Sequence, residues 1–216
     1  MTRKWMIVDL ETIAIDGVDS FIEEQSAPSN WKDPEKIAAY VADAKRAAAQ
    51  KAALDIDLAR IVCLGYWLSE EPEPTIATCK TEDDEKAALA QLLPYFKDFE
   101  RTLIGFNSAR YDWPLLMRRA SYLGLPVPHI NVDKYRTPNV DLWQKLSFNG
   151  AISAHGLRWY ARRLKWDDLL DADPLKDGGG DVAEAIAANR WDDVAWHCDT
   201  DVRLTHRLAQ WQQVIG

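Results

Sequence analysis

Two acidic residues interrupt an apolar run near the start of the chain. The run begins at Trp5 and is rich in large and β-branched residues, which is typical of a buried strand, and Asp9 and Glu11 lie two positions apart at its end. Because side chains alternate across a strand with a period of two, both carboxylates are expected on one face. Adjacent carboxylates repel each other, and hard divalent cations such as Mg²⁺ or Mn²⁺ relieve that repulsion. The alternative is that these acids begin a solvated turn, and this stretch alone leaves both interpretations open.

A histidine and an aspartate four residues apart form a second candidate site near the other end of the chain. His197 and Asp201 fall within an expected helix at 191–213, and positions four apart share a helix face. Leu204 and Leu208 continue the line of Asp201, so this acid borders the buried side of the helix. A surface ion pair is the ordinary explanation for such spacing. An acid beside apolar residues and one turn from a titratable histidine fits a metal ligand with its general base better.

A third candidate segment follows a short buried strand, at a position where α/β sheets tend to bind ligands. Asn107 and Asp112 are polar residues of this segment, and Asp112 is expected at the start of the next helix, two residues before Pro114. Asp112 could serve as an ordinary helix N-cap, which this segment alone favours. Alternatively, its short carboxylate projects toward Asp9 and Glu11.

The elements that would position these residues follow from hydrophobic periodicity and turn signals. The expected strands span 5–12, 60–68, 75–79, 102–106 and 138–143. The expected helices span 33–54, 82–99, the region before Leu123, 153–164, 181–188 and 191–213, and an acidic loop with a Gly178–Gly180 turn follows residue 164. Three strands followed by alternating helices and strands predict an α/β fold, in which helices flank a mixed sheet. We expect one domain over 1–216, with the alanine-rich helix as an insertion at about 30–56.

Composition narrows the function classes. The 216 residues carry 26 basic and 34 acidic side chains, so the formal charge is −8, which argues against a broad basic surface that coats nucleic acid. An acidic pocket whose bound cations meet phosphates remains compatible with this charge. The three cysteines form neither a CxxC zinc pattern nor a disulfide framework, and no apolar stretch approaches the ~18 residues that span a bilayer. We therefore expect a cytoplasmic protein without membrane contact.

Taken together, the three segments resemble the motifs of the DEDD 3′→5′ exonucleases. The run Asp9–Thr12 is similar to the first motif of that family, Asn107–Asp112 to the second and His197–Val202 to the third, in the same order across nearly the whole chain. Details such as Asp33–Ile37, with the alanine-rich helix, most resemble the polymerase-B-like, tyrosine-type predicted exonucleases of bacteria and phages. The resemblance implies an RNase H-like fold with a five-stranded mixed sheet.

The resemblance also implies a catalytic site. Its metal ligands would be Asp9, Glu11, Asp112 and Asp201, which would hold two divalent cations, Mg²⁺ or Mn²⁺, about 3.5–4 Å apart. Such a pair activates a water for attack on the last phosphodiester and releases a nucleoside 5′-monophosphate. Leu10, Thr12 and Asn107 would contact the terminal nucleotide. Candidate phosphate contacts, each more often a solvated charge, are Arg110, Arg118, Arg119, Arg158, Arg162 and Arg163.

The third motif departs from the tyrosine-type pattern. In that subgroup a tyrosine lies four residues before the last aspartate, where this chain has His197. In the histidine subgroup the histidine lies five residues before it, a position that Trp196 occupies here. Five residues turn a helix by about 500°, which places Trp196 roughly 140° away from the face of Asp201. We predict that His197 orients or deprotonates the attacking water, with His155 as a second candidate base.

Three functions stay open at this point. The preferred one is a 3′→5′ exonuclease acting on single-stranded DNA. The second is the same chemistry on short RNA, with the 2′-hydroxyl read near Leu10 and Thr12. The third is a catalytically silent module that binds a nucleic-acid 3′ end or a replication or repair partner.

Overall fold

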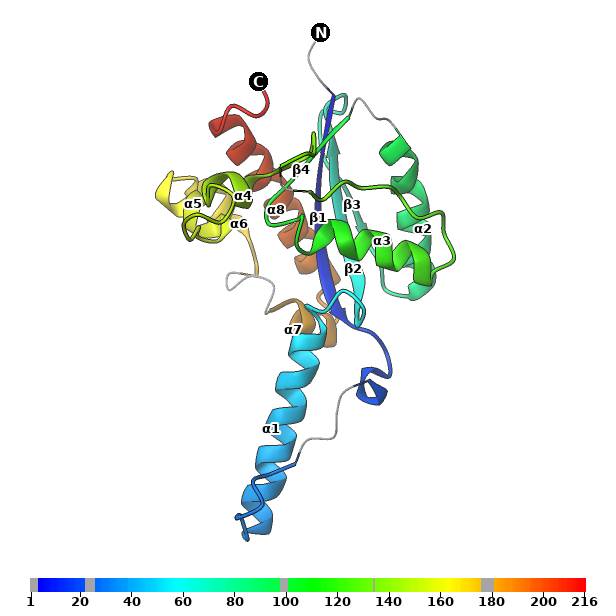
Figure 1. Cartoon of the computed structure of the whole chain (residues 1–216), viewed down its shortest axis with the longest axis vertical. Helices are drawn as coiled ribbons and strands as arrows, with labels where there is room; N and C mark the ends of the chain where they lie inside the picture. The colour runs from blue at the N-terminus through cyan, green and yellow to red at the C-terminus, as the bar shows by residue number, and fades with distance from the viewer. Residues whose placement is uncertain (1–3, 22–25, 98–100, 134, 176–180) are drawn as a thin grey trace.

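The computed structural model describes residues 4–21, 26–97, 101–133, 135–175 and 181–216. A five-stranded sheet lies at its centre, and Figure 1 labels strands β1 to β4. The strand order is β3-β2-β1-β4-β5. The strands are β1 Trp5–Ala14, β2 Ala59–Leu68, β3 Thr75–Thr78, β4 Thr102–Gly105 and β5 Val140–Asp141. The first three pair antiparallel, whereas β4 pairs parallel with β1 and with β5. The predicted mixed five-stranded sheet is therefore confirmed.

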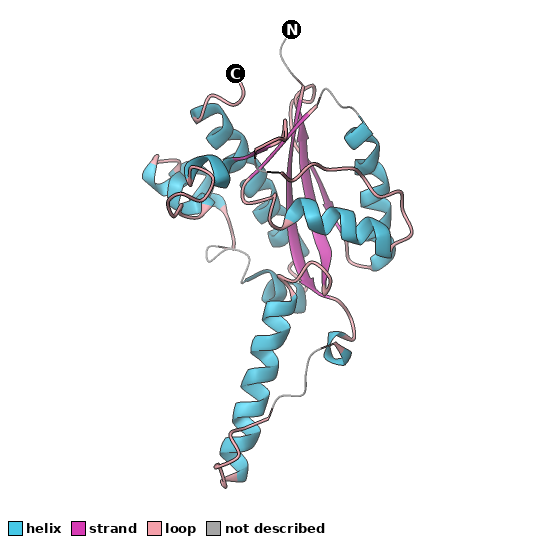
Figure 2. Ribbon diagram, in the orientation of Figure 1, coloured by secondary structure: helices cyan, strands magenta, loops and turns pink. Residues whose placement is uncertain are grey.

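Helices cover both faces of this sheet (Figure 2). On one face, α2 Glu82–Leu92 and α3 Asp112–Tyr122 pack over Met6, Val8 and Leu10 of β1. On the other face, α8 Trp191–Trp211 packs over Ile7, with α5 Leu157–Arg163 and α6 Asp167–Ala172 beside it. The side chains of β1 thus alternate between the two layers, as the period of a strand requires. Asp9 and Glu11 continue the series of Ile7 and face α8.

Helix α8 approaches the sheet closely at Gly65 of β2. A Cβ atom at Gly65 would lie 2.8 Å from Cys198 Sγ and 2.8 Å from Val202 Cγ2, both on α8. Since real Cβ atoms essentially never come so close to another heavy atom, only glycine allows this separation. Asp9 pairs with Gly65 in the sheet register, so the close approach brings α8 directly over the acidic part of β1.

Helix α1, Pro34–Ala52, lies between β1 and β2 in the chain and projects away from the sheet (Figure 1). Its start is stabilised by Asp33, whose Oδ1 accepts the backbone N–H of Glu35 at 3.1 Å. Its end is attached near the sheet, where the Ala53 carbonyl accepts hydrogen bonds from Thr12 Oγ1 at 2.8 Å and Tyr111 OH at 2.6 Å. The remaining short element of this region is the 3₁₀ turn η1, Val18–Ser20.

Several predicted boundaries were wrong. The region predicted as an acidic loop contains α6, and α5 begins at Leu157 rather than at 153, since Gly156 has an extended backbone. The fifth strand has only two residues, because the Asp141 carboxylate accepts the N–H groups of Trp143 and Gln144 and so caps α4, Leu142–Leu146. Helix α2 ends at Leu92, and the 3₁₀ segment η2, Leu93–Lys97, contains Pro94.

Two predicted features lie outside the described residues. These are the Gly178–Gly180 turn and the end of the helix predicted to reach Phe99. The remaining helix is α7, Val182–Ala187. Within the described part of the chain, no helix combines the length and the apolar character that a membrane crossing needs.

Replacing Gly65 by alanine tests the close approach of α8. We expect Gly65→Ala to lower the free energy of unfolding by about 1–3 kcal/mol, because the new methyl group forces α8 away from β2. Thermal and chemical denaturation would measure this. The matched control is Gly156→Ala, since a Cβ there meets nothing within 4 Å and the φ angle of −75° suits alanine. Equal stability of the two variants would contradict this packing.

Candidate metal centre

The first pair of acids lies under α8 on the central strand. Glu11 is only 7% exposed, and Asp9 is half-buried at the wall of a pocket. Burial raises the pKa of Asp9 well above its ordinary value, and the charges of Asp201 and Asp112 raise it further. Burial likewise raises the pKa of Glu11, and Asp9 adds to that effect. The pKa of Asp9 is therefore affected by acids from two other segments of the chain.

Asp112 is the first residue of α3 and is 7% exposed. It does not cap the helix, because the N-cap position belongs to Tyr111. Burial raises the pKa of Asp112 to about 7, against the lowering effect of hydrogen bonds that include the backbone N–H of Leu10. Asp112 lines the same pocket as Asp9.

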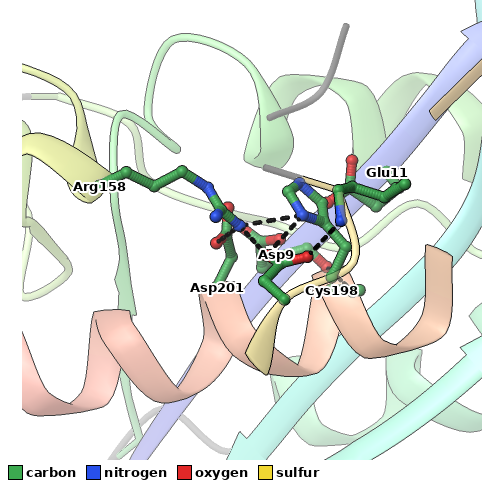
Figure 3. A network of polar contacts seen from close by, with 8 residues as sticks. Asp9, Glu11, Arg158, Cys198 and Asp201 are labelled. Carbon is green, nitrogen blue, oxygen red and sulfur yellow. Dashed lines mark hydrogen bonds and ion pairs between the residues drawn. The ribbon is translucent and has the colours of Figure 1, made fainter. Parts of the chain in front are cut away.

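Asp201 reaches the same place from α8, with a side chain that is 19% exposed. Its pKa is raised by burial, while the charge of Arg158 acts in the opposite direction. Arg158 Nη2 donates to Asp201 Oδ1 at 2.8 Å, an interaction visible in Figure 3. Asp9, Asp112 and Asp201 line one pocket of about 560 Å³. The other lining residues are Leu54, Phe106, Asn107, Arg110, Tyr111 and Leu157.

His197 lies next to Glu11, and its side chain is buried with 1% of the residue exposed. Its Nε2 is 3.5 Å from Glu11 Oε1, and its Nδ1 is 2.8 Å from Asp173 Oδ2. Trp196, by contrast, is 55% exposed, as the rotation of the helix predicts. The predicted action of His197 on the attacking water stays a prediction.

The hydrogen atoms of Arg158 decide which nitrogen of His197 carries a proton. Arg158 Nη2 donates to both Asp201 Oδ1 and Asp173 Oδ2, which uses its two hydrogens. Although Nη2 also lies 2.9 Å from His197 Nδ1, it has no hydrogen left to donate there. His197 Nδ1 therefore carries a hydrogen and donates it to Asp173. In the neutral ring, the lone pair of Nε2 then faces Glu11.

Asp173 is a residue of this site that the sequence did not reveal. Its side chain is fully buried just after α6. Burial acts to raise its pKa, but hydrogen bonds from His197 and Arg158 outweigh that effect and lower it. In the sequence it stands among other acids, Asp167, Asp168 and Asp171, and nothing in its local pattern distinguishes it from them.

Asp141 supports the loop that carries Asn107. Its carboxylate accepts the backbone N–H groups of Asn107 at 2.9 Å and Ala109 at 3.0 Å, in addition to capping α4. Asn107 has a φ angle of 60°, in the left-handed region that asparagine tolerates better than most residues. The loop thereby places Asn107 at the pocket wall.

The other expected substrate contacts are distributed differently. The side chain of Leu10 is buried in the core beneath α2 and α3, on the opposite face from the acids, and Thr12 Oγ1 bonds to Ala53 and lies 2.9 Å from Tyr111 OH. Their predicted contacts with a nucleotide stay predictions.

The arginine candidates also separate into groups. Arg110 lines the pocket and Arg158 pairs with Asp201, whereas Arg119 is buried in an ion pair with Glu85. Arg118 pairs with Asp57, and the last two candidates, Arg162 and Arg163, are exposed at the end of α5. His155, the second candidate base, is exposed and stacks on Trp159.

The donor groups of the cluster fit divalent cations. Glu11, His197 and Asp201 each offer one ligand atom, and these three atoms lie within 4.8 Å of one another. Oxygen ligands suit Mg²⁺ and Mn²⁺, and an imidazole nitrogen suits the transition metals. Four ionised carboxylates would carry four negative charges, which two divalent cations would cancel. We use the name acidic cluster for Asp9, Glu11, Asp112 and Asp201.

Comparison with known proteins gives a similarity of fold. The family B DNA polymerase of the hyperthermophilic archaeon Pyrobaculum calidifontis aligns over 99% of this chain with a TM-score of 0.59 and 18% identity, which confirms the RNase H-like fold. The chain spans only 25% of that polymerase chain. An ExoI/SSB-Ct complex aligns over 70% of this chain and 31% of its own, with 11% identity and a TM-score of 0.39, which is too low to carry an argument. No protein-family model and no curated protein matches the chain.

The acidic cluster predicts how stability depends on pH without cations. The folded-state pKa of Asp112, about 7, exceeds the ordinary value of 3.8, so the folded protein binds more protons than the unfolded chain between these values. The free energy of unfolding should therefore fall as pH rises from about 4 to 7. We expect the melting temperature in EDTA to fall over this window, and Mn²⁺ to restore it at pH 8.

Asp112→Asn provides the control for this experiment. The amide does not titrate, so the variant should show a smaller fall of the melting temperature with pH. His206 acts in the opposite direction below about pH 6.5 because burial lowers its pKa, and comparison with Asp112→Asn removes its contribution. A melting temperature that rises with pH in the wild type and in the variant alike would contradict this account.

Proposed function

We propose that this chain is a metal-dependent 3′→5′ exonuclease that hydrolyses single-stranded DNA and releases nucleoside 5′-monophosphates. The observation that carries the proposal is the acidic cluster, in which β1, α3 and α8 contribute carboxylates to one place. Acids gathered at such an electrostatic cost are typical of a cation-binding site. The similarity of fold to a DNA polymerase supports a nucleic-acid substrate. We extend the proposal to the whole chain as one domain, with α1 as its insertion.

The four carboxylates of the acidic cluster would bind the cations together. In the proposed enzyme, Asp9, Glu11, Asp112 and Asp201 hold two divalent cations. When bound, such cations lower the pKa of an attacking water and stabilise the departing 3′ oxygen. The buried position of the ligands fixes their geometry before substrate arrives. His197 lies beside Glu11, and its contact with Asp173 fixes the orientation of the imidazole ring.

The pocket suits the end of a strand better than a duplex. Its volume of about 560 Å³ lies within the range typical of sites for small molecules, which supports one terminal nucleotide as its occupant. Leu54 and Phe106 offer apolar surface for a base, while Asn107 and Arg110 offer polar contacts. Because the chain has a formal charge of −8, the cations themselves would supply most of the attraction for phosphate at this place.

A degradation assay tests the proposal. Single-stranded DNA labelled at its 5′ end should shorten stepwise in Mn²⁺ or Mg²⁺ and stay intact in EDTA. We expect Asp9→Asn and Asp201→Asn to lower the rate by more than about 100-fold, since each removes a cation ligand. The matched control is Asp199→Asn on the same helix, because Asp199 pairs with Arg203 outside the cluster. Undiminished cleavage by Asp201→Asn would contradict the proposal.

The same assay distinguishes the other two functions. RNA of the same sequence, degraded faster than DNA, would make RNA the substrate. Retained binding of 3′ ends without cleavage in either cation would identify a silent binding module.

A further inference from the structure

We propose that His197 Nε2 is itself a ligand of the cation held by Glu11 and Asp201, so that this position selects a transition-metal ion, Mn²⁺, Co²⁺ or Zn²⁺, over Mg²⁺. This inference rests on the proposed function, because it concerns the metal chemistry of the same site. It assigns His197 a bond to the metal and therefore a different role from that of a free base.

The separation between the ligand atoms supports this role. His197 Nε2 and Glu11 Oε1 are 3.5 Å apart, near the outer limit for a hydrogen bond. If a metal bound both atoms at about 2.1 Å, the angle between the two bonds at the metal would be about 110°, close to the tetrahedral value. Neighbouring ligands of octahedral Mg²⁺ at about 2.1 Å would lie only about 3.0 Å apart. The spacing therefore suits a tetrahedral ion such as Zn²⁺ or Co²⁺, whereas the preference for Mn²⁺ over Mg²⁺ comes from the nitrogen donor itself.

The orientation of the imidazole ring supports it further. His197 Nδ1 donates its hydrogen to the fully buried Asp173, which leaves the lone pair of Nε2 directed toward Glu11. A carboxylate that accepts the far N–H of a ligating histidine is the usual support of such a ligand, because it fixes the tautomer and increases basicity. Leu175 N–H in turn donates to Asp173 Oδ1 at 2.8 Å, so the support is itself held in place.

Arg158 does not prevent this arrangement. It binds Asp201 through Oδ1, which leaves the second carboxylate oxygen for a cation. Its positive charge also compensates Asp173, whose carboxylate it contacts together with His197. The imidazole therefore lies beside the oppositely charged pair of Arg158 and Asp173.

Electron spin-echo spectroscopy of the full chain loaded with Mn²⁺ tests the proposal directly. We expect a ¹⁴N coupling from a bound imidazole in the wild type, lost in His197→Gln and retained in His129→Gln, which replaces an exposed histidine outside the site. Titration calorimetry should show that His197→Gln weakens Mn²⁺ binding at least about 10-fold and Mg²⁺ binding less than about threefold. Asp173→Asn, which keeps the histidine, should weaken Mn²⁺ binding in the same direction.

The outcomes separate this inference from the proposed function. A wild-type Mn²⁺ complex without ¹⁴N coupling overturns the inference, whatever the variants do, even if DNA is degraded. Nitrogen coordination in a protein that degrades neither DNA nor RNA supports the metal site and overturns the exonuclease. If His197→Gln fails to fold, the wild-type spectrum and the Mn²⁺ affinity of Asp173→Asn still decide.

Discussion

The burial of several carboxylates, together with the repulsion between them, is the constraint around which this molecule is built. Three elements that are far apart in the chain must converge to bring Asp9, Asp112 and Asp201 to one pocket, and each lies there at an electrostatic cost. Part of the compensation is internal. Asp112 occupies the first turn of α3, where a helix favours negative charge, and Arg158 pairs with Asp201. The remainder must come from protons or from bound cations.

The packing of the fold explains why the cluster stays together despite this cost. Gly65 lets α8 lie against β2, and the alternation of β1 places Met6, Val8 and Leu10 in the core on the opposite face. The energy of these hydrophobic layers does not depend on the charges between them. A well-packed scaffold can therefore hold an unfavourable site in a fixed geometry, which is what catalytic and binding sites require.

The features predicted from the sequence are those that depend on local periodicity. The two-residue spacing of Asp9 and Glu11 predicted a shared face, and both acids do interact with groups of α8. The four-residue spacing of His197 and Asp201 likewise predicted that they would be neighbours, and both belong to one group of possible ligands. The mixed sheet also followed from the order of strands and helices, and the resemblance of the motifs implied its RNase H-like arrangement.

The features that the sequence did not reveal depend on contacts between distant segments. Asp173 and Asp141 look like ordinary loop or strand residues, and only the folded chain brings their partners to them. Among six candidate arginines, only burial and pairing separate Arg158, in the cluster, from Arg119, in the core. Helix α6 was missed because its short acidic sequence has no extended apolar period, and its stability comes from packing against α8.

The attachment of α1 has a mechanical consequence for the pocket. One carbonyl, that of Ala53, receives the hydroxyls of Thr12 and Tyr111, and Tyr111 and the adjacent Leu54 both line the pocket. The helix extends about 28 Å from this joint, given its 19 residues. Because the residues that follow α1 belong to the pocket wall, any change in the position of the helix end would alter the shape of the pocket at Leu54 and Tyr111.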